Sequence, residues 1–219
     1  MDITNPVIRE YIASVMPERS EALQELHDYA VLNDVPIIKH EMEQFLTFIV
    51  TMHRPLRILE IGTAIGYSAI VMAKASSNQA EIITLEKSDK MVAIARDNFS
   101  QFDLNERIEV VPGDAVLTIK ALEQPFDLIF MDAAKGQYMN FYEDALRLLK
   151  PGGLLIADNI LQDGLVAKSR FAIPRRQRTI HSRMRLFVKS LMEHPELTTS
   201  VLSIADGGTI SIRNKASVN

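Results

Sequence analysis

Short apolar runs alternate with helical patterns from residue 57 onward. Five runs have the length and composition of buried strands, and they cover 57–61, 81–85, 108–111, 128–131 and 154–157. Between them, segments such as 88–99 and 138–149 carry apolar residues at helical spacing. Strands that alternate with helices in this way form βαβ units, so the pattern predicts an α/β protein with a parallel sheet.

The two ends of the sequence depart from this alternation. The first fifty residues have helical spacing: Leu23, Leu26 and Ala30 share one face, and the stretch 45–50 makes a second. After a long polar stretch that begins near residue 163, a helix is predicted over 179–193, followed by two strands over 198–204 and 209–212. Asp206-Gly207-Gly208 between these strands is a turn signal, so the pair is predicted to close the sheet as an antiparallel hairpin.

Composition narrows the class of protein. With 219 residues, of which 47% are hydrophobic, we expect a single domain over 1–219, with helices over 1–54 and an α/β core over 55–219. The chain has no cysteine, which excludes disulfides, thiolate zinc sites and cysteine nucleophiles. It shows neither a secretory signal nor an apolar run near the ~20 residues of a membrane span, so we expect a cytoplasmic protein with no membrane partner.

Polar residues and glycines lie at or just after the ends of three of the predicted strands. Glu60, Gly62 and Gly66 stand in LEIGTAIGYSAI, Asp132 in DLIFMDAAKGQY, and Asp158 with Asn159 in LLIADNI. Because parallel strands end at the same edge of a sheet, these clusters are predicted to meet where open α/β folds bind ligands. Two carboxylates and a carboxamide form a plausible partial shell for a hard cation such as Mg²⁺.

The glycine spacing argues against a dinucleotide site. Gly62 and Gly66 do not fit G-x-G-x-x-G, and Glu60 would repel a pyrophosphate. Glu60 could instead order the loop or face a cation such as the sulfonium of S-adenosylmethionine, while Glu86 stands where it can accept hydrogen bonds from both ribose hydroxyls. The competing interpretation is that the two glycines only permit a tight turn and close helix packing.

A basic segment contrasts with the net charge of −4 of the whole chain. From Lys168 to Lys189 there are eight lysines and arginines and no acidic residue, which indicates a polyanionic partner. Arginine suits phosphate because its donors bind it bidentately, and Phe171 and His181 could add base stacking. A solvated helical face, or contacts to acidic residues in a dimer, would explain the same run.

Taken together, EIGTAIGYSAI, FMDAAKGQY and IADNIL resemble the metal-dependent class I O-methyltransferases, which include catechol and caffeoyl-CoA methyltransferases. The resemblance covers nearly the whole chain and implies a Rossmann-like fold with a seven-stranded, mostly parallel sheet. The stretch near Pro36, the arginine-rich PRRQR and the closing DGG are similar to the bacterial branch of this family that methylates 5-hydroxyuridine in tRNA.

The resemblance also implies roles for individual residues. It makes Asp132, Asp158 and Asn159 the ligands of Mg²⁺ or Mn²⁺, and Lys135 the general base. It places S-adenosylmethionine against Ile38, Glu60, Gly62, Ser68, Glu86, Asp114 and Asp132. We expect the phosphate contacts to come from Arg175, Arg176 and Arg178, and the family's habit suggests a homodimer.

The expected reaction needs two vicinal oxygens on the substrate, which a divalent ion can chelate while it stabilises the deprotonated hydroxyl. A catechol has such a pair, and so does 5-hydroxyuracil, so the metal site alone does not choose between them. The arginine segment favours 5-hydroxyuridine at the wobble position of the tRNA anticodon. The alternatives are a small catechol-like or CoA-linked phenol and, from another class, a non-catalytic RNA-binding module.

Overall fold

The computed structural model describes residues 5–134, 136–162 and 164–215. In this part of the chain seven strands form one sheet in the order β3-β2-β1-β4-β5-β7-β6. The parallel strands are β1 (Arg57–Ile61), β2 (Glu81–Glu86), β3 (Ile108–Pro112), β4 (Phe126–Met131) and β5 (Leu149–Ala157). The last strand, β7 (Gly208–Arg213), is antiparallel to both of its neighbours, β5 and β6 (Leu197–Leu202). The predicted seven-stranded α/β fold with a C-terminal antiparallel hairpin is confirmed.

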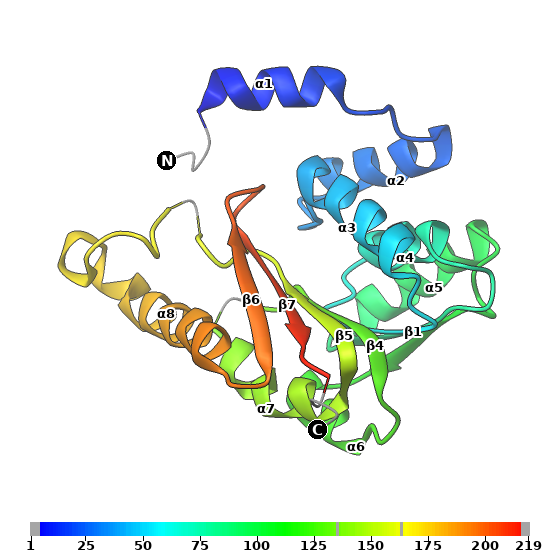
Figure 1. The fold of residues 1–219 in the computed structure, drawn as a ribbon. Coiled ribbons are helices and arrows are strands. Elements are labelled where there is room, and N and C mark those ends of the chain that lie inside the picture. Colours follow the sequence, from blue (N-terminus) through cyan, green and yellow to red (C-terminus); the bar gives the residue numbers. More distant parts are fainter. Residues whose placement is uncertain (1–4, 135, 163, 216–219) are drawn as a thin grey trace.

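Helices cover both faces of this sheet (Figure 1). The described helices are α1 (Pro6–Val15), α2 (Glu21–Leu32), α3 (His40–His53), α4 (Tyr67–Ala75), α5 (Asp89–Gln101), α6 (Ala115–Ala121), α7 (Tyr138–Leu148) and α8 (Arg178–Glu193), with short 3-10 turns at Arg170–Ala172 and Arg175–Gln177. Among them, α2 to α5 contribute to the core on one face, and α6 to α8 to the core on the other. No helix in the described part of the chain is long and apolar enough to cross a membrane.

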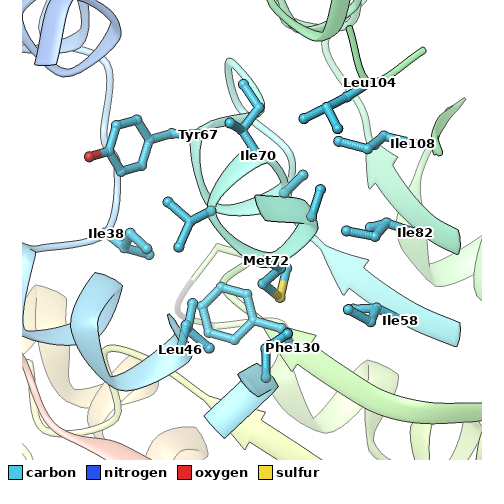
Figure 2. Close-up of a cluster of buried hydrophobic side chains, with 14 of the residues drawn as sticks. Ile38, Leu46, Ile58, Tyr67, Ile70, Met72, Ile82, Leu104, Ile108 and Phe130 are labelled. Carbon is cyan, nitrogen blue, oxygen red and sulfur yellow. The ribbon is translucent and has the colours of Figure 1, made fainter. Parts of the chain in front are cut away.

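The two cores follow from the alternation of side chains along each strand. In β1, Ile58 belongs to one core and Leu59 to the other, and both are fully buried. Figure 2 shows the first core, where Met72 of α4, the sheet residue Phe130 and Leu46 of α3 lie close together. Because both faces are covered, the parallel strands read as continuous apolar runs, which is why the sequence revealed them.

Most strand boundaries differ from the prediction by one or two residues, and the largest difference is at the fifth strand. The fifth strand begins at Leu149 instead of residue 154, and the Pro151-Gly152-Gly153 sequence near its start hides it from a pattern-based assignment. A register shift in β4 opposite this stretch accommodates the irregularity. The sixth strand ends at Leu202 instead of residue 204, because the carbonyl of Ile204 accepts the Gly207 N–H at 2.7 Å and so belongs to the turn.

Candidate active site

A cavity of about 670 Å³ opens at the carboxyl ends of the parallel strands. Its wall includes a residue that ends or follows each of these five strands: Gly62, Glu86, Asp114, Asp132 and Asp158. The connection between α2 and α3, the turn between β6 and β7, and residues of α4, α6 and α7 also line it. The volume lies in the usual range for small-molecule sites, and the place in the fold is the one at which open α/β sheets bind ligands.

The loop between β1 and α4 depends on its glycines. Gly62 has a φ of 104°, and a Cβ added there would lie 2.3 Å from the backbone oxygen of Asp132. Gly66 has a φ of 85°, and its added Cβ would meet the ring of Phe99 at 2.4 Å. Both glycines therefore have the steric role considered above, a tight turn and close packing. The same compactness brings the β1 loop against the end of β4, where both line the cavity.

Glu60 lies behind the cavity wall and has no solvent exposure. Its two carboxylate oxygens accept hydrogen bonds from Ser68 Oγ and Thr84 Oγ1, each at 2.5 Å. Burial raises the pKa of Glu60 to about 8, partly offset by these two hydrogen bonds, while the charges of Asp132 and Glu86 raise it further. Glu60 thus joins β1, β2 and α4 beneath the loop, whereas the other six predicted cofactor residues line the cavity itself.

The carboxylate of Glu86 is oriented by two backbone amides. Ala64 N–H donates to Oε2 at 2.9 Å, and Ser88 N–H donates to Oε1 at 2.8 Å. Each oxygen keeps a second lone pair, so the group can still accept a hydrogen bond from a pair of ligand hydroxyls. Asp114 caps α6 through the Val116 N–H at 3.0 Å, and Ile38 contributes a buried apolar side chain.

Asp132, Asp158 and Asn159 meet at one end of the cavity. Asn159 Nδ2 donates to Asp132 Oδ1 at 2.9 Å, and the backbone N–H of Asn159 donates to Asp158 Oδ1 at 2.6 Å. Asn159 has a φ of 58°, the left-handed conformation that asparagine tolerates best among residues with side chains. Burial, and next the negative charge of Asp132, raise the pKa of Asp158 well above its ordinary range.

This donor set fits a hard divalent cation. Two carboxylates repel one another in a buried setting, and a cation that both can bind relieves the repulsion. The described residues contain no group of three or more His, Cys, Asp and Glu side chains placed to hold a metal. The predicted set differs from such a group because its third member is the amide of Asn159, a common oxygen donor to Mg²⁺ and Ca²⁺.

Lys135, the predicted general base, lies outside the described residues. Its neighbours on both sides are placed: Ala133, Ala134 and Gln137 all line the cavity. The loop is held from outside by α8, since Arg183 Nη1 donates to the Gly136 carbonyl at 3.1 Å.

The arginine segment divides into an exposed part and a structural part. Arg175 and Arg176 are exposed, and Phe171 keeps 86% of its surface exposed. Arg178 is half-buried, and its Nε finds no hydrogen-bond partner among the described residues. Further along, Arg183 and Arg185 donate to backbone carbonyls of neighbouring loops. None of these arginines belongs to the described wall of the cavity.

The suggestion that His181 stacks on a base does not fit the structure. His181 is only 3% exposed, and its Nε2 lies 3.0 Å from the carbonyl oxygen of Lys168. The apolar side of α8 turns inward here because Met184 and Phe187 on the same face pack in the core. A buried imidazole in that place supports the loop instead of presenting a ring to solvent.

Sequence reasoning missed an ion pair at the cavity. Lys39 Nζ lies 2.6 Å from Asp206 Oδ1, and both residues line the cavity beside Asp158 and Asn159. The two residues are separated by 167 positions, so no local pattern could have paired them. The sequence analysis did single out residues next to each partner: Ile38 beside Lys39, and the glycines of the hairpin turn beside Asp206.

Comparisons of the sequence and of the structure with known proteins all point to O-methyltransferases. The sequence profile of a family described as O-methyltransferase matches residues 13–214. A catechol O-methyltransferase of Niastella koreensis is 33% identical over 165 residues, covering 73% of this chain and 75% of that protein. A caffeoyl-CoA O-methyltransferase of Populus kitakamiensis is 27% identical, covering 96% of this chain and 95% of that protein. The crystal structure of an O-methyltransferase from Bacillus cereus in complex with SAH superimposes with a TM-score of 0.83 at 28% identity, covering 95% of this chain and 97% of that one.

Proposed function

Because the chain belongs to the O-methyltransferase family, we propose that it transfers the methyl group of S-adenosylmethionine to one of two neighbouring oxygens of its substrate, with a divalent metal ion bound beside them. The observation that carries the proposal is that Asp132, Asp158 and Asn159 line the same cavity as Gly62 and Glu86. The proposed cation site and the proposed nucleoside site therefore share one cavity, as a methyl transfer to a chelated oxygen requires.

For the cofactor, we assign Glu86 to the ribose hydroxyls, since its carboxylate is held at the end of β2 with acceptor capacity to spare. Gly62 and Asp132 border the space between the ribose and the metal end, and Ile38, Ser68 and Asp114 complete the wall. Glu60 acts from behind by fixing Ser68 and Thr84. The SAH bound to the Bacillus cereus relative, which is what S-adenosylmethionine becomes on losing its methyl group, supports S-adenosylmethionine as the cofactor.

For the metal, Asp132, Asp158 and Asn159 would hold Mg²⁺ or Mn²⁺. When bound, such an ion stabilises the ionised form of a coordinated hydroxyl near neutral pH. Lys135 is proposed to accept the proton of that hydroxyl, since it follows Asp132 by three residues on the loop that lines the cavity. Tyr138 OH donates to the backbone carbonyl of Asp158 at 2.9 Å and so helps to hold the metal end in place.

For the substrate, a small catechol-like or CoA-linked phenol is the first candidate. The relatives named catechol and caffeoyl-CoA O-methyltransferase support it, and the second of these aligns over nearly the whole chain. A catechol ring also matches the needs of the site, since its two adjacent oxygens can bind one cation together.

The second candidate is 5-hydroxyuridine at the wobble position of tRNA, converted to 5-methoxyuridine. The observation in its favour is the exposed basic surface formed by Arg175 and Arg176, with the exposed ring of Phe171 beside them in sequence. Guanidinium groups and an exposed aromatic ring are the features that bind phosphates and unpaired bases. A small phenol that carries no phosphate has no use for such a surface.

The metal-assisted reaction is tested by Asp158→Ala. We expect the variant to lose turnover while it still binds S-adenosylmethionine in calorimetry, because the other strands supply most of the cofactor wall. EDTA should have the same effect on the unmodified protein, with activity restored by Mg²⁺ or Mn²⁺. Full activity in a rigorously metal-free preparation would end this proposal, and absence of cofactor binding would favour a non-catalytic module.

The two substrate classes are separated by replacing Arg175 and Arg176 with alanine together. If they bind phosphate, tRNA affinity should fall and its log–log salt dependence should flatten by roughly 0.7 to 0.9 for each phosphate that the variant no longer neutralises. Methylation of a small catechol should hardly change. Lys189→Ala is the matched control, since Lys189 is an exposed cation near the other end of α8. Mass spectrometry of nucleosides from treated tRNA reads the product directly, and an unchanged salt profile would leave the small phenol as the substrate.

A further inference from the structure

The Lys39–Asp206 ion pair connects two parts of the cavity wall that are far apart in the sequence. Lys39 ends the α2–α3 connection and is the residue before α3, while Asp206 stands in the β6–β7 turn. The two charged atoms are 2.6 Å apart. The side chain of Asp206 is only 15% exposed and that of Lys39 is half exposed, so the pair is shielded on the side of the carboxylate.

On the Lys39 side, the pair reaches the cofactor end of the cavity. Ile38, which precedes Lys39, is buried in the cavity wall, and the Lys39 carbonyl accepts the Glu43 N–H at 2.9 Å. Glu43 in turn accepts a hydrogen bond from Tyr67, another residue of the wall. A ligand that packs against Ile38 therefore also fixes the backbone of Lys39.

On the Asp206 side, the pair reaches the metal end. The carbonyl of Asp206 accepts the Leu161 N–H at 3.0 Å, and the carbonyl of Gly207 accepts the Ile160 N–H at 2.9 Å. These two amides immediately follow Asn159. The turn packs tightly against this segment, since a Cβ at Gly207 would lie 2.3 Å from Leu161 Cγ. The position of the turn thus determines the position of the segment that carries Asp158 and Asn159.

We propose that Lys39 and Asp206 are positioning residues whose ion pair couples cofactor binding to divalent-cation binding. A cofactor held against Ile38 fixes Lys39, Lys39 fixes the β6–β7 turn, and the turn fixes Asp158 and Asn159 in the geometry that binds the cation. This rests on the metal site proposed above. By linkage the effect is reciprocal, so each ligand raises the affinity for the other by the same factor.

The test measures Mn²⁺ affinity with and without saturating SAH, by the paramagnetic resonance signal of free Mn²⁺. SAH is the better probe than S-adenosylmethionine because it lacks the sulfonium charge that would repel the metal directly. In the unmodified protein we expect SAH to tighten Mn²⁺ binding by about fivefold or more, the lower end of typical coupling factors. In Lys39→Met this factor should fall close to one, and Lys39→Arg should keep most of it.

Three further variants make the result specific. Asp206→Asn retains the backbone carbonyl that holds Leu161, so it tests the charge alone, and the double variant Lys39→Met/Asp206→Asn should show no further loss of coupling. Lys150→Met is the matched control, because Lys150 Nζ makes a similar 2.7 Å pair with Asp127 outside the cavity wall. In Lys150→Met, SAH should tighten Mn²⁺ binding by the same factor as in the unmodified protein.

The outcomes separate this inference from the proposed function. If Mn²⁺ binds but SAH does not change its affinity, or if Lys39→Met keeps the full factor, the coupling role is wrong while the metal site stands. If Mn²⁺ does not bind and methyl transfer needs no metal, the metal site fails and the coupling fails with it. Should Lys39→Met not fold, Asp206→Asn gives the same measurement from the other partner.

Discussion

Glu60 shows how one buried carboxyl organises the start of the proposed cofactor site. It has no solvent exposure, and hydroxyls of Ser68 and Thr84 donate to its two oxygens. Thr84 Oγ1 also lies 2.5 Å from Thr63 Oγ1, so the network extends into the β1–α4 loop. Such a network holds the loop most firmly when every group is satisfied, and it is sensitive to the charge of its central member.

Glu60 predicts a pH dependence of stability. Its folded pKa of about 8 lies above the ordinary 4.5, so the folded protein retains a proton that the unfolded chain has released between these values. This contribution to stability is complete below pH 4.5 and is lost as pH rises through about 8. At 1.36 kcal/mol for each pH unit, the upper limit is about 5 kcal/mol.

Glu60→Gln removes the ionisation and tests that prediction. Relative to the parent, its free energy of unfolding in urea should improve steadily between about pH 5 and about pH 8.5, because only the parent has to bury a charge there. Asp127→Asn is a useful comparison, since the pKa of Asp127 is lowered and not raised, despite partial burial, by its hydrogen bonds and charge contact with Lys150 and the backbone. Parallel pH profiles for parent and Glu60→Gln would show that Glu60 does not hold the extra proton.

Lys135 provides a prediction on the chemical step. If it accepts the substrate proton, Lys135→Met should lower kcat by roughly 10²-fold or more and leave S-adenosylmethionine affinity nearly unchanged. Raising the pH should restore part of the rate, because hydroxide can then replace the missing base. An unchanged kcat at neutral pH would make Lys135 an ordinary surface lysine.

At the scale of elements, the β1–α4 loop lines the cavity, and its backbone is held in place by the neighbouring strands. Gly62 N–H donates to the Leu85 carbonyl of β2 at 3.1 Å, while Asp132 N–H donates to the Ile61 carbonyl at 3.0 Å. The loop is thereby held between the ends of β2 and β4, and it can come this close only because residue 62 has no side chain.

Gly62→Ala should therefore destabilise the protein by about 1–3 kcal/mol, the usual cost of strained backbone, and weaken cofactor binding at the same time. The contributions are the positive φ of 104° and the 2.3 Å overlap with the Asp132 backbone oxygen. Gly136→Ala is the control for stability, since the nearest atom to its added Cβ among the described residues is Arg183 Nη1, 3.7 Å away. Equal unfolding midpoints in denaturant for the two variants would contradict this account.

How much was predictable depends on how local each signal is. The parallel strands and the hairpin turn follow from short runs of residues, so their positions along the chain could be predicted. Because parallel strands end at one edge of a sheet, Asp132, Asp158 and Asn159 could also be placed at that edge. The start of β5 could not be placed, because Pro151 and Gly152 look like strand breakers and only pairing with β4 reveals the strand. The Lys39–Asp206 pair is a purely tertiary contact.

For the whole molecule, α1 stands apart from the other described α-helices, each of which buries at least one residue. It contributes no buried residue, and Val7, Tyr11 and Val15 form an exposed apolar stripe with 72%, 68% and 62% exposure. Figure 1 shows α1 extended across the top, beyond α2 and α3. An amphipathic helix gains its stability mainly from burying such a stripe, which is consistent with the predicted homodimer.

The homodimer is tested by light scattering on the purified chain. We expect the mass of a dimer, and the double variant Tyr11→Arg/Val15→Arg should shift the mass toward that of the monomer, since charges would oppose burial of the stripe. Ala13→Arg places the same charge on the opposite side of α1 and should leave the mass unchanged. A monomer at all concentrations, or a dimer unaffected by the double variant, would remove α1 from the interface.

The sheet order has a consequence for the protein during its synthesis. β7 follows β6 in the sequence but lies between β5 and β6 in the sheet, so the outer edge of β5 has no partner until residues 208–213 have left the ribosome. The strands that carry Gly62 and Glu86 can pair long before that moment, whereas Asp158 and Asn159 extend from an open edge. During synthesis there is therefore an interval in which the residues of the proposed nucleoside site can come together while β5 still offers unpaired backbone to other chains. The pairing of β7 with β5 ends that exposure.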